Sequence, residues 1–202
     1  MSRWLRNPYV WAFVVGCALT TLMRPFLRRI PPPPPVLWQV PAFTLVDSQG
    51  RPFGSEELRG HVYVANFFFT RCPSVCPTLM KGMATLQRRF REENLEAIRL
   101  VSISVDSYDT PQRLHDAEPG YGVEPSRWVL LTGPGESVRS LAVDGFRVAL
   151  SEGDAVADIA HAAKLLLVDG SGALRGIYDS DELGLDEAFW RARRVVEESR
   201  GS

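Results

Sequence analysis

Cysteine is scarce in this chain: its 202 residues contain three, Cys17, Cys72 and Cys76. Small proteins held together by disulfides carry more, and a chain of this length can stabilise one globular domain by burying a hydrophobic core. We therefore expect any pairing of Cys72 with Cys76 to serve chemistry rather than stability.

The chain also lacks the positive charge that nucleic-acid binding needs. Residues 1–35 hold five of the 23 basic groups and none of the acidic ones, so residues 36–202 keep 18 basic against 24 acidic groups, a formal charge of −6. An acidic body of this kind repels phosphate backbones. This charge balance excludes nucleic-acid binding as a main role.

The one long uncharged run lies near the N-terminus. Between Asn7 and Arg24 there are 16 residues without a charge, close to the roughly 20 that a membrane-spanning helix needs. We expect residues 1–30 to be a membrane anchor with basic flanks. A cleaved signal peptide and lipid attachment at Cys17 are alternatives, the latter because residues 14–17, Val-Val-Gly-Cys, resemble a bacterial lipoprotein cleavage box.

Five consecutive prolines, residues 31–35, follow this run. They favour a polyproline II rod of roughly 15 Å. Residues 31–37 are therefore expected to be a linker, which either holds the domain away from a bilayer or merely ends the preceding helix. The domain itself is expected over residues 38–202.

Within this domain, short apolar runs alternate with helix-like stretches. The expected strands are 42–46, 61–69, 98–105, 128–132, 164–168 and 174–178, and the expected helices are 77–93, 110–117, 135–141 and 185–199. Such alternation predicts an α/β domain with a central, mostly parallel sheet.

Cys72 and Cys76 stand in the turn between the strand at 61–69 and the helix that follows. The N-terminus of a helix favours thiolate over thiol, and a thiolate attacks disulfides or binds metal. Three intervening residues allow the two sulfurs either to form a disulfide or to bind one ion, and soft sulfur ligands suit Cu(I) or zinc. A structural disulfide or two inert core thiols remain alternatives.

Two thiolates need a further metal ligand, and the chain has three histidines. His61 opens the strand at the end far from the cysteines, so it is expected to be solvated. His115 lies in a polar helix-like stretch and is expected on the surface. His161 stands among small residues directly before the strand at 164–168, where a loop can approach the cysteine turn. We predict His161 as the third ligand.

Four segments in order resemble the SCO/SenC family of copper proteins. They are residues 43–60 with Phe-Thr-Leu-Val-Asp and Leu-Arg-Gly, residues 66–77 with Thr-Arg-Cys-Pro-Ser-Val-Cys-Pro, residues 104–111 ending in Asp-Thr-Pro, and residues 128–133 followed by His161 and 167–172. The resemblance covers about residues 40–198 and implies a thioredoxin-like fold with a central mixed sheet flanked by helices.

The resemblance also implies a copper site formed by Cys72, Cys76 and His161. Asp106 and Asp109 would be supporting acidic residues near it. The chain departs from the family at position 107, where serine replaces the usual proline, and at positions 160 and 162, where alanines flank the histidine. Losses around a ligand can weaken metal binding 10- to 100-fold.

By resemblance, the protein is expected to be a metallochaperone that helps assemble the dinuclear copper centre of cytochrome c oxidase, with the copper-bearing subunit as partner. Oxidase copper sites face the outer side of the bacterial inner membrane, so the domain is expected on that periplasmic side. That compartment oxidises dithiols, which implies a thiol reductant partner.

The alternative function is a membrane-tethered thiol–disulfide oxidoreductase that acts on the cysteines of a copper protein. Cys72 would then attack and Cys76 would resolve the mixed disulfide. Thioredoxin-like reductases place a cis-proline beside the dithiol, and residues 158–164 contain no proline. A peroxidase, the third alternative, would gain little from Cys76 or His161. The histidine therefore favours metal binding over these two alternatives. A protein that only binds and delivers a metal is not expected to be a turnover enzyme.

Overall fold

The computed structural model describes residues 8–27, 32–148 and 163–201. The chain divides into two compact units, residues 1–32 and residues 33–202. Each unit is described by itself.

The N-terminal unit contains one helix, α1 (Pro8–Leu27). Its last turns include Arg24, so the uncharged run ends before the helix does. Across the described residues, no helix combines the length and the apolar character that crossing a bilayer requires. The membrane span expected within residues 1–30 is therefore not supported by the structure.

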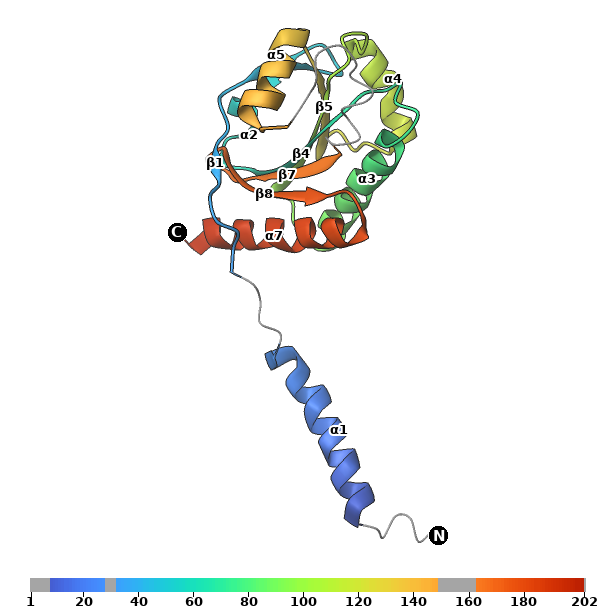
Figure 1. Cartoon of the computed structure of the whole chain (residues 1–202), viewed down its shortest axis with the longest axis vertical. Helices are drawn as coiled ribbons and strands as arrows, with labels where there is room; N and C mark the ends of the chain where they lie inside the picture. Colours follow the sequence, from blue (N-terminus) through green and yellow to red (C-terminus); the bar gives the residue numbers. More distant parts are fainter. Residues whose placement is uncertain (1–7, 28–31, 149–162, 202) are drawn as a thin grey trace. The chain divides into compact units, whose positions relative to one another are not determined.

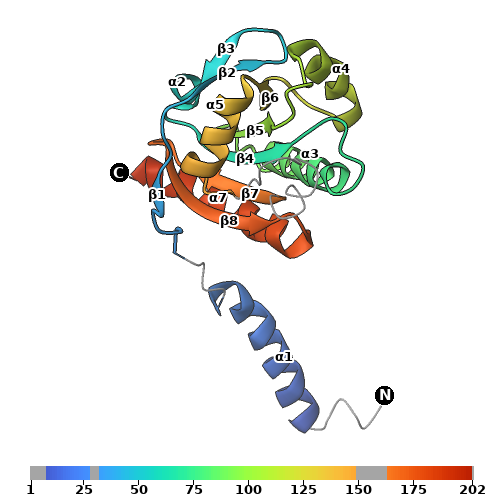
Figure 2. The same ribbon diagram turned by 45° about the horizontal axis from the view of Figure 1, so that its top comes forward.

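The second unit is built on one eight-stranded sheet with the strand order β1-β8-β7-β4-β5-β6-β2-β3. Figures 1 and 2 show this sheet, and Figure 2 labels its two edge strands, β1 and β3. The strands are β1 (Trp38–Gln39), β2 (Thr44–Asp47), β3 (Pro52–Gly54), β4 (Val62–Phe68), β5 (Ile98–Ser104), β6 (Trp128–Thr132), β7 (Lys164–Val168) and β8 (Ala173–Asp179). The helices are α2 (Ser55–Leu58), α3 (Cys76–Glu92), α4 (Pro111–Tyr121), α5 (Gly135–Ser140), the π-helical turn η2 (Leu141–Gly145) and α7 (Glu182–Gly201).

The sheet is mixed, as the family resemblance implies. Among the described strands, β4 pairs in parallel with β5, and β5 with β6, whereas the other five pairings are antiparallel. The expectation of a mostly parallel sheet was therefore wrong. For two of these pairings, β2–β3 and β7–β8, the physical reason is the short connection, because a tight turn joins only antiparallel strands. The other three antiparallel pairings join strands that are far apart in the sequence.

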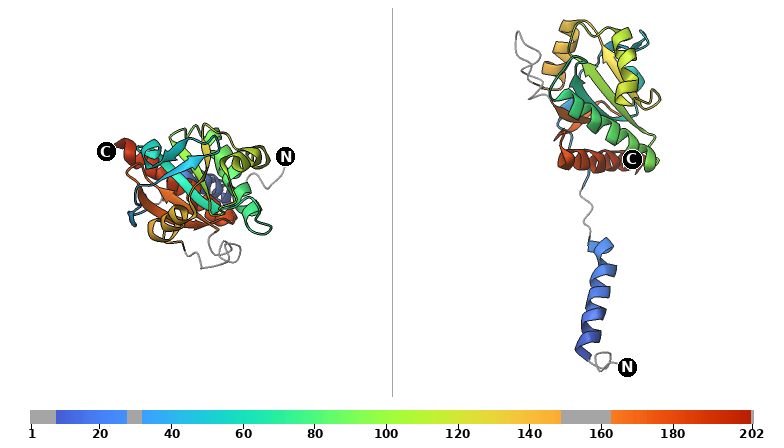
Figure 3. Two further views of the ribbon diagram at one scale, coloured as in Figure 1. Left: turned by 90° about the horizontal axis from the view of Figure 1, so that it is seen from above. Right: turned by 90° about the vertical axis from the view of Figure 1, so that its right-hand side faces the viewer.

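Helices cover both faces of the sheet, with β4 at its centre. Every residue of β4 is buried, and successive side chains of a strand point to opposite faces. Phe67 packs edge-on against Phe146 after η2, at 5.6 Å between ring centroids, while Phe68 packs edge-on against Tyr121 of α4, at 6.0 Å. Helices α3 and α7 lie side by side (Figure 3), joined by the stacked rings of Phe90 and Phe189.

All the expected strands and helices of the domain are present, with ends shifted by a few residues. The sequence analysis missed β1, β3 and α2, which are only two to four residues long. Segments this short contain too few residues to show a hydrophobic period.

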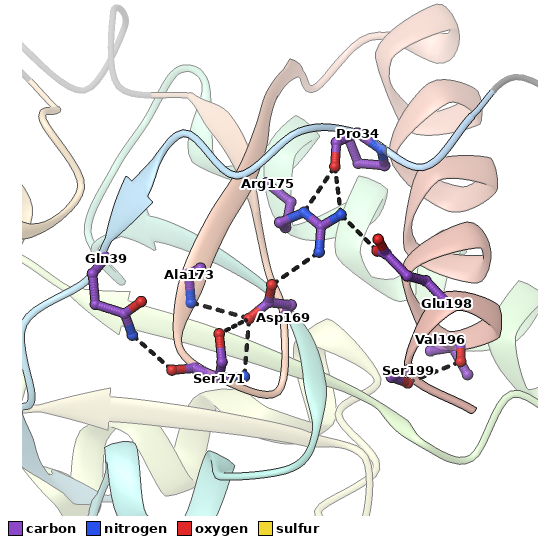
Figure 4. Close-up of polar contacts among 9 residues, drawn as sticks. All are labelled: Pro34, Gln39, Asp169, Ser171, Ala173, Arg175, Val196, Glu198 and Ser199. Carbon is purple, nitrogen blue, oxygen red and sulfur yellow. Dashed lines mark hydrogen bonds and ion pairs between the residues drawn. The ribbon is translucent and has the colours of Figure 1, made fainter. Parts of the chain in front are cut away.

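A buried arginine ties the chain before β1 to β8 and α7. Arg175 on β8 is 8% exposed, and its Nε and Nη2 donate to the carbonyl oxygen of Pro34 at 2.8 and 2.6 Å (Figure 4). Nη1 donates to Asp169 at 3.0 Å and Nη2 to Glu198 at 2.6 Å. Leu37 also donates its backbone N–H to the carbonyl of Leu174, at 2.8 Å. From Pro34 onward, the proline-rich segment is bonded to the domain.

Asp169 also shapes the turn between β7 and β8. Its Oδ1 accepts from the backbone N–H groups of Ser171, at 2.9 Å, and Ala173, at 3.1 Å (Figure 4). Burial acts to raise the pKa of Asp169, but hydrogen bonds from Ser171, Arg175 and Ala173 hold it below its usual value. The carboxylate is therefore charged in the folded protein and offsets the charge of Arg175.

We predict that Arg175→Met lowers the free energy of unfolding by about 3 kcal/mol, because it leaves the Asp169 carboxylate and the Pro34 carbonyl without their donor. Urea unfolding at neutral pH measures this. Because folding lowers the pKa of Asp169, the ion pair stabilises the protein above the unfolded pKa of about 4, and this contribution disappears as pH falls through the folded pKa.

Arg59→Met is the matched control, since Arg59 pairs with Glu56 at the exposed surface of α2. Its cost should stay below about 1 kcal/mol. Equal losses in the two variants would show that the buried position of Arg175 has no special role in stability.

Candidate metal centre

The two cysteines lie where β4 passes into α3. Strand β4 ends at Phe68, and the N–H of Cys72 donates to the carbonyl of Phe69 at 3.3 Å, which closes a tight turn. Cys76 is the first residue of α3. Cys72 is 8% exposed and Cys76 is 1% exposed, so Cys72 is the thiol nearer to solvent.

The sulfur of Cys72 accepts hydrogen bonds from the start of the helix. The backbone N–H of Cys76 lies 3.4 Å from it, and the Ser74 hydroxyl lies 3.9 Å from it. Burial acts to raise the pKa of Cys72, but hydrogen bonds from the Cys76 thiol and from the backbone of Ser74 and Cys76 lower it below its ordinary value. Cys72 is thus the more acidic thiol of the pair.

Cys76 behaves in the opposite way. Burial, followed by its hydrogen bond to Cys72, raises the pKa of Cys76 to about 12. The expectation that the helix start favours thiolate holds for Cys72 and is wrong for Cys76, because removal from water outweighs the backbone dipoles at the deeper position.

The acidic residues expected near the site hold the turn that precedes Cys72. Asp109, 1% exposed, accepts from the backbone N–H of Thr70 at 2.8 Å, from the Thr70 hydroxyl, and from the Ser104 hydroxyl at 2.6 Å. Asp106 accepts from Nη2 and Nε of Arg71 at 2.8 and 3.1 Å. Both carboxylates therefore fix residues 70 and 71, directly before the first cysteine.

Tyr121 is a neighbour of the site that the sequence analysis missed. It ends α4 and packs against Phe68. Burial raises its pKa, and the neighbouring acidic groups of Cys76, Asp109 and Cys72 act in the same direction. No sequence signal identifies this residue, because its place depends on how α4 packs on the sheet.

The three histidines have different positions. His61 precedes β4, at the end of the strand opposite to the cysteines. The His115 side chain on α4 is 56% exposed, with Nδ1 at 3.4 Å from Glu118. His161 lies outside the described residues. Within the described residues, no three His, Cys, Asp or Glu side chains form a group that could hold a metal ion.

Strand β7 nevertheless brings the chain next to His161 close to the cysteine turn. β7 runs antiparallel to β4, with Ala65 opposite Leu166, so the start of β7 lies beside the end of β4 that leads to Cys72. A recess of about 380 Å³ is lined by Ser74 and Val75, which lie between the cysteines, and by Ala163, two residues after His161.

Similarity to known proteins identifies the family of this chain. The sequence model of the SCO1/SenC family matches residues 38–197. The chain belongs to the SCO1/SenC family. This match spans the whole sheet, the cysteine turn and the segment that contains His161.

Individual relatives and solved structures are also similar to this chain. A protein of Stutzerimonas stutzeri, provisionally named as copper-binding, is 34% identical over 142 residues, which are 68% of this chain and 67% of that protein. BsSco, described as a Sco-family cytochrome c oxidase assembly protein with a disulfide switch, is 25% identical with a TM-score of 0.73 over 82% of this chain and 98% of its own.

The copper-bound structure of Arabidopsis thaliana ScoI shares the fold. Its TM-score is 0.62 at 23% identity, over 81% of this chain and 99% of that one. The mixed α/β fold of this chain is therefore the thioredoxin-like fold of the Sco proteins.

We predict that iodoacetamide modifies Cys72 about tenfold or more faster than Cys76 at neutral pH, because a lowered pKa leaves more thiolate at a given pH. Mass spectrometry of the tryptic peptides measures both rates, in a Cys17→Ser background that removes the exposed third cysteine. Labelling of Cys72 should begin at a lower pH than that of free cysteine, and labelling of Cys76 should rise only toward pH 12. Faster labelling of Cys76 would contradict this assignment.

Proposed function

We propose that the protein is a copper-binding metallochaperone that helps assemble the dinuclear copper centre of cytochrome c oxidase. Cys72 and Cys76 hold Cu(I) through their sulfurs, and His161 completes the site. Copper is the cargo that this site receives and releases, so the protein does not act as a turnover enzyme.

The observation that carries this proposal is the shared recess beside the cysteine turn. Ser74 and Val75 line it together with Ala163. Two residues of extended chain span up to about 7 Å, so His161 has the reach to approach the same turn. This supports His161 as the third ligand.

The chemistry of the donor set fits copper. The two sulfurs are soft donors and the imidazole is an intermediate one. Donors of these kinds suit Cu(I) better than a hard cation. The proposal also agrees with the names of relatives, one of them provisionally named as copper-binding and another described as an oxidase assembly protein.

A second candidate function, thiol–disulfide exchange on the cysteines of a copper protein, is favoured by the unequal thiols. Such exchange uses an attacking sulfur that ionises readily and a deeper resolving sulfur that keeps its proton. Against it, residues 158–164 contain no proline, and a histidine near the dithiol adds nothing to disulfide exchange.

The proposed partners follow from the cargo. The acceptor is the copper-bearing subunit of the oxidase, which places the domain on the outer, periplasmic side of the bacterial inner membrane. An oxidised cysteine pair does not bind Cu(I), so a thiol reductant is required in that compartment.

We predict that His161→Ala weakens copper binding by at least about tenfold, since loss of a supporting group alone can cost 10- to 100-fold. Cys72→Ser or Cys76→Ser should abolish binding of one copper per chain. Copper content and competition with a Cu(I) chelator, on reduced full-length protein carrying Cys17→Ser, give these values.

His115→Ala is the matched control and should bind copper like the parent protein, because His115 is exposed and pairs with Glu118. The His161→Ala protein should still reduce a model disulfide at close to the parent rate. A His161→Ala strain with full oxidase activity at low external copper would overturn the copper-delivery function and favour the oxidoreductase.

We further predict that a reporter enzyme fused after Arg29 is active if it is of a kind that works only outside the cytoplasm. A reporter that works only inside the cytoplasm should be inactive at the same position. Mass spectrometry of the mature protein will identify its N-terminus, either an intact Met1 or a lipid-modified Cys17. A reporter active only in the cytoplasm would contradict the proposed compartment.

A further inference from the structure

The residue directly before Cys72 is an arginine whose side chain is held in one position at the protein surface. Nη2 and Nε of Arg71 both donate to Oδ2 of Asp106, at 2.8 and 3.1 Å. Its guanidinium carbon lies 4.5 Å from the ring centroid of Tyr108. Arg71, Asp106 and Tyr108 are called the arginine platform below.

One carboxylate connects the members of the exposed platform. The second oxygen of Asp106 accepts the backbone N–H of Tyr108 at 2.9 Å, so one carboxylate fixes both the guanidinium and the loop that carries the ring. Asp106 is only 10% exposed, whereas the side chain of Arg71 is 55% exposed and Tyr108 is 64% exposed. A group held in this way loses little conformational freedom when it binds.

Stability does not account for the platform. An ion pair with such an exposed arginine contributes little to folding. In the described part of the chain, Nη1 of Arg71 makes no hydrogen bond, so two N–H donors of the guanidinium face outward. Arginine and tyrosine in this arrangement are typical of the energetic centres of protein interfaces.

We propose that the arginine platform recognises a carboxylate on the partner protein that reacts at Cys72. Charge complementarity supports this occupant, because Arg71 directly precedes the more exposed thiol in the chain and its guanidinium keeps N–H donors that Asp106 does not use. A guanidinium binds a carboxylate through parallel hydrogen bonds. The platform thus selects a partner with an acidic group next to its own reacting sulfur or copper site.

The identity of the partner rests on the proposed function, but recognition of an anion at Cys72 can be measured without copper. The probes are the dianionic disulfide dithiodinicotinate and its uncharged parent dithiodipyridine. The Cys72 thiolate attacks one sulfur of the probe, forming a mixed disulfide and releasing the first aromatic thiolate. Cys76 then loses its proton and attacks Cys72, so that the protein is oxidised by two electrons and the second aromatic thiolate leaves.

Reduced full-length protein carrying Cys17→Ser is mixed with each probe, and the release of aromatic thiolate is followed by absorbance. Arg71→Gln should lower the ratio of the dianionic rate to the uncharged rate about three- to tenfold at low ionic strength. The difference should disappear at about 1 M salt, where charges are screened beyond about 3 Å. A change in thiolate content affects both probes equally and leaves the ratio unchanged.

Arg59→Gln is the control for net charge, because it removes one exposed cation at the other end of β4 and should leave the ratio within twofold of the parent value. An unchanged ratio in Arg71→Gln, or an equal fall in Arg59→Gln, would overturn the proposal. Full oxidase activity of the His161→Ala strain at low external copper would refute the copper-delivery function while leaving this ratio unaffected, so the two failures are distinguishable.

Discussion

The conformation of the cysteine turn depends on the buried carboxylate of Asp109. Strand β4 would otherwise end in free backbone groups, but Asp109 accepts the N–H and the hydroxyl of Thr70 and the hydroxyl of Ser104. A carboxylate that is 1% exposed is tolerable only when several donors surround it. Because these donors come from the ends of β4 and β5, the position of Cys72 is coupled to the parallel pairing of the two strands.

The domain separates its chemistry from its attachment. The cysteines follow the C-terminal end of β4, whereas the turn at Asp169 lies beside the N-terminal end, since Tyr63 is opposite Val168. Arg175 binds the Pro34 carbonyl next to that turn. The seven residues of β4 span about 20 Å, so the chain enters the domain at the end of β4 away from the thiols.

Much of this arrangement could be predicted from sequence, and the exceptions have physical causes. The buried strands β4, β6 and β7 were found because apolar runs bounded by polar residues are conspicuous. The direction of the strands was not predicted, because apolar periodicity is the same for parallel and antiparallel strands. Connection length indicates the direction only for strands that follow one another, such as β7 and β8. The cysteine pair was found from its place at a strand–helix junction, but Tyr121 and the contact of Arg71 with Tyr108 depend on tertiary packing. His161 was selected by its small neighbours and remains a prediction, since it lies outside the described residues.

The unequal burial of the two thiols links metal binding to proton release. Cys72 is the more acidic thiol of the metal-free dithiol, while Cys76 keeps its proton because its deeper position raises its pKa to about 12. A metal ion that takes both sulfurs must displace that proton, so its affinity increases with pH as long as Cys76 is protonated in the free protein. The same proton also leaves when a disulfide forms. Cys76 therefore makes both reactions depend on an acceptor for its proton, and only a third ligand such as His161 distinguishes copper binding from disulfide exchange.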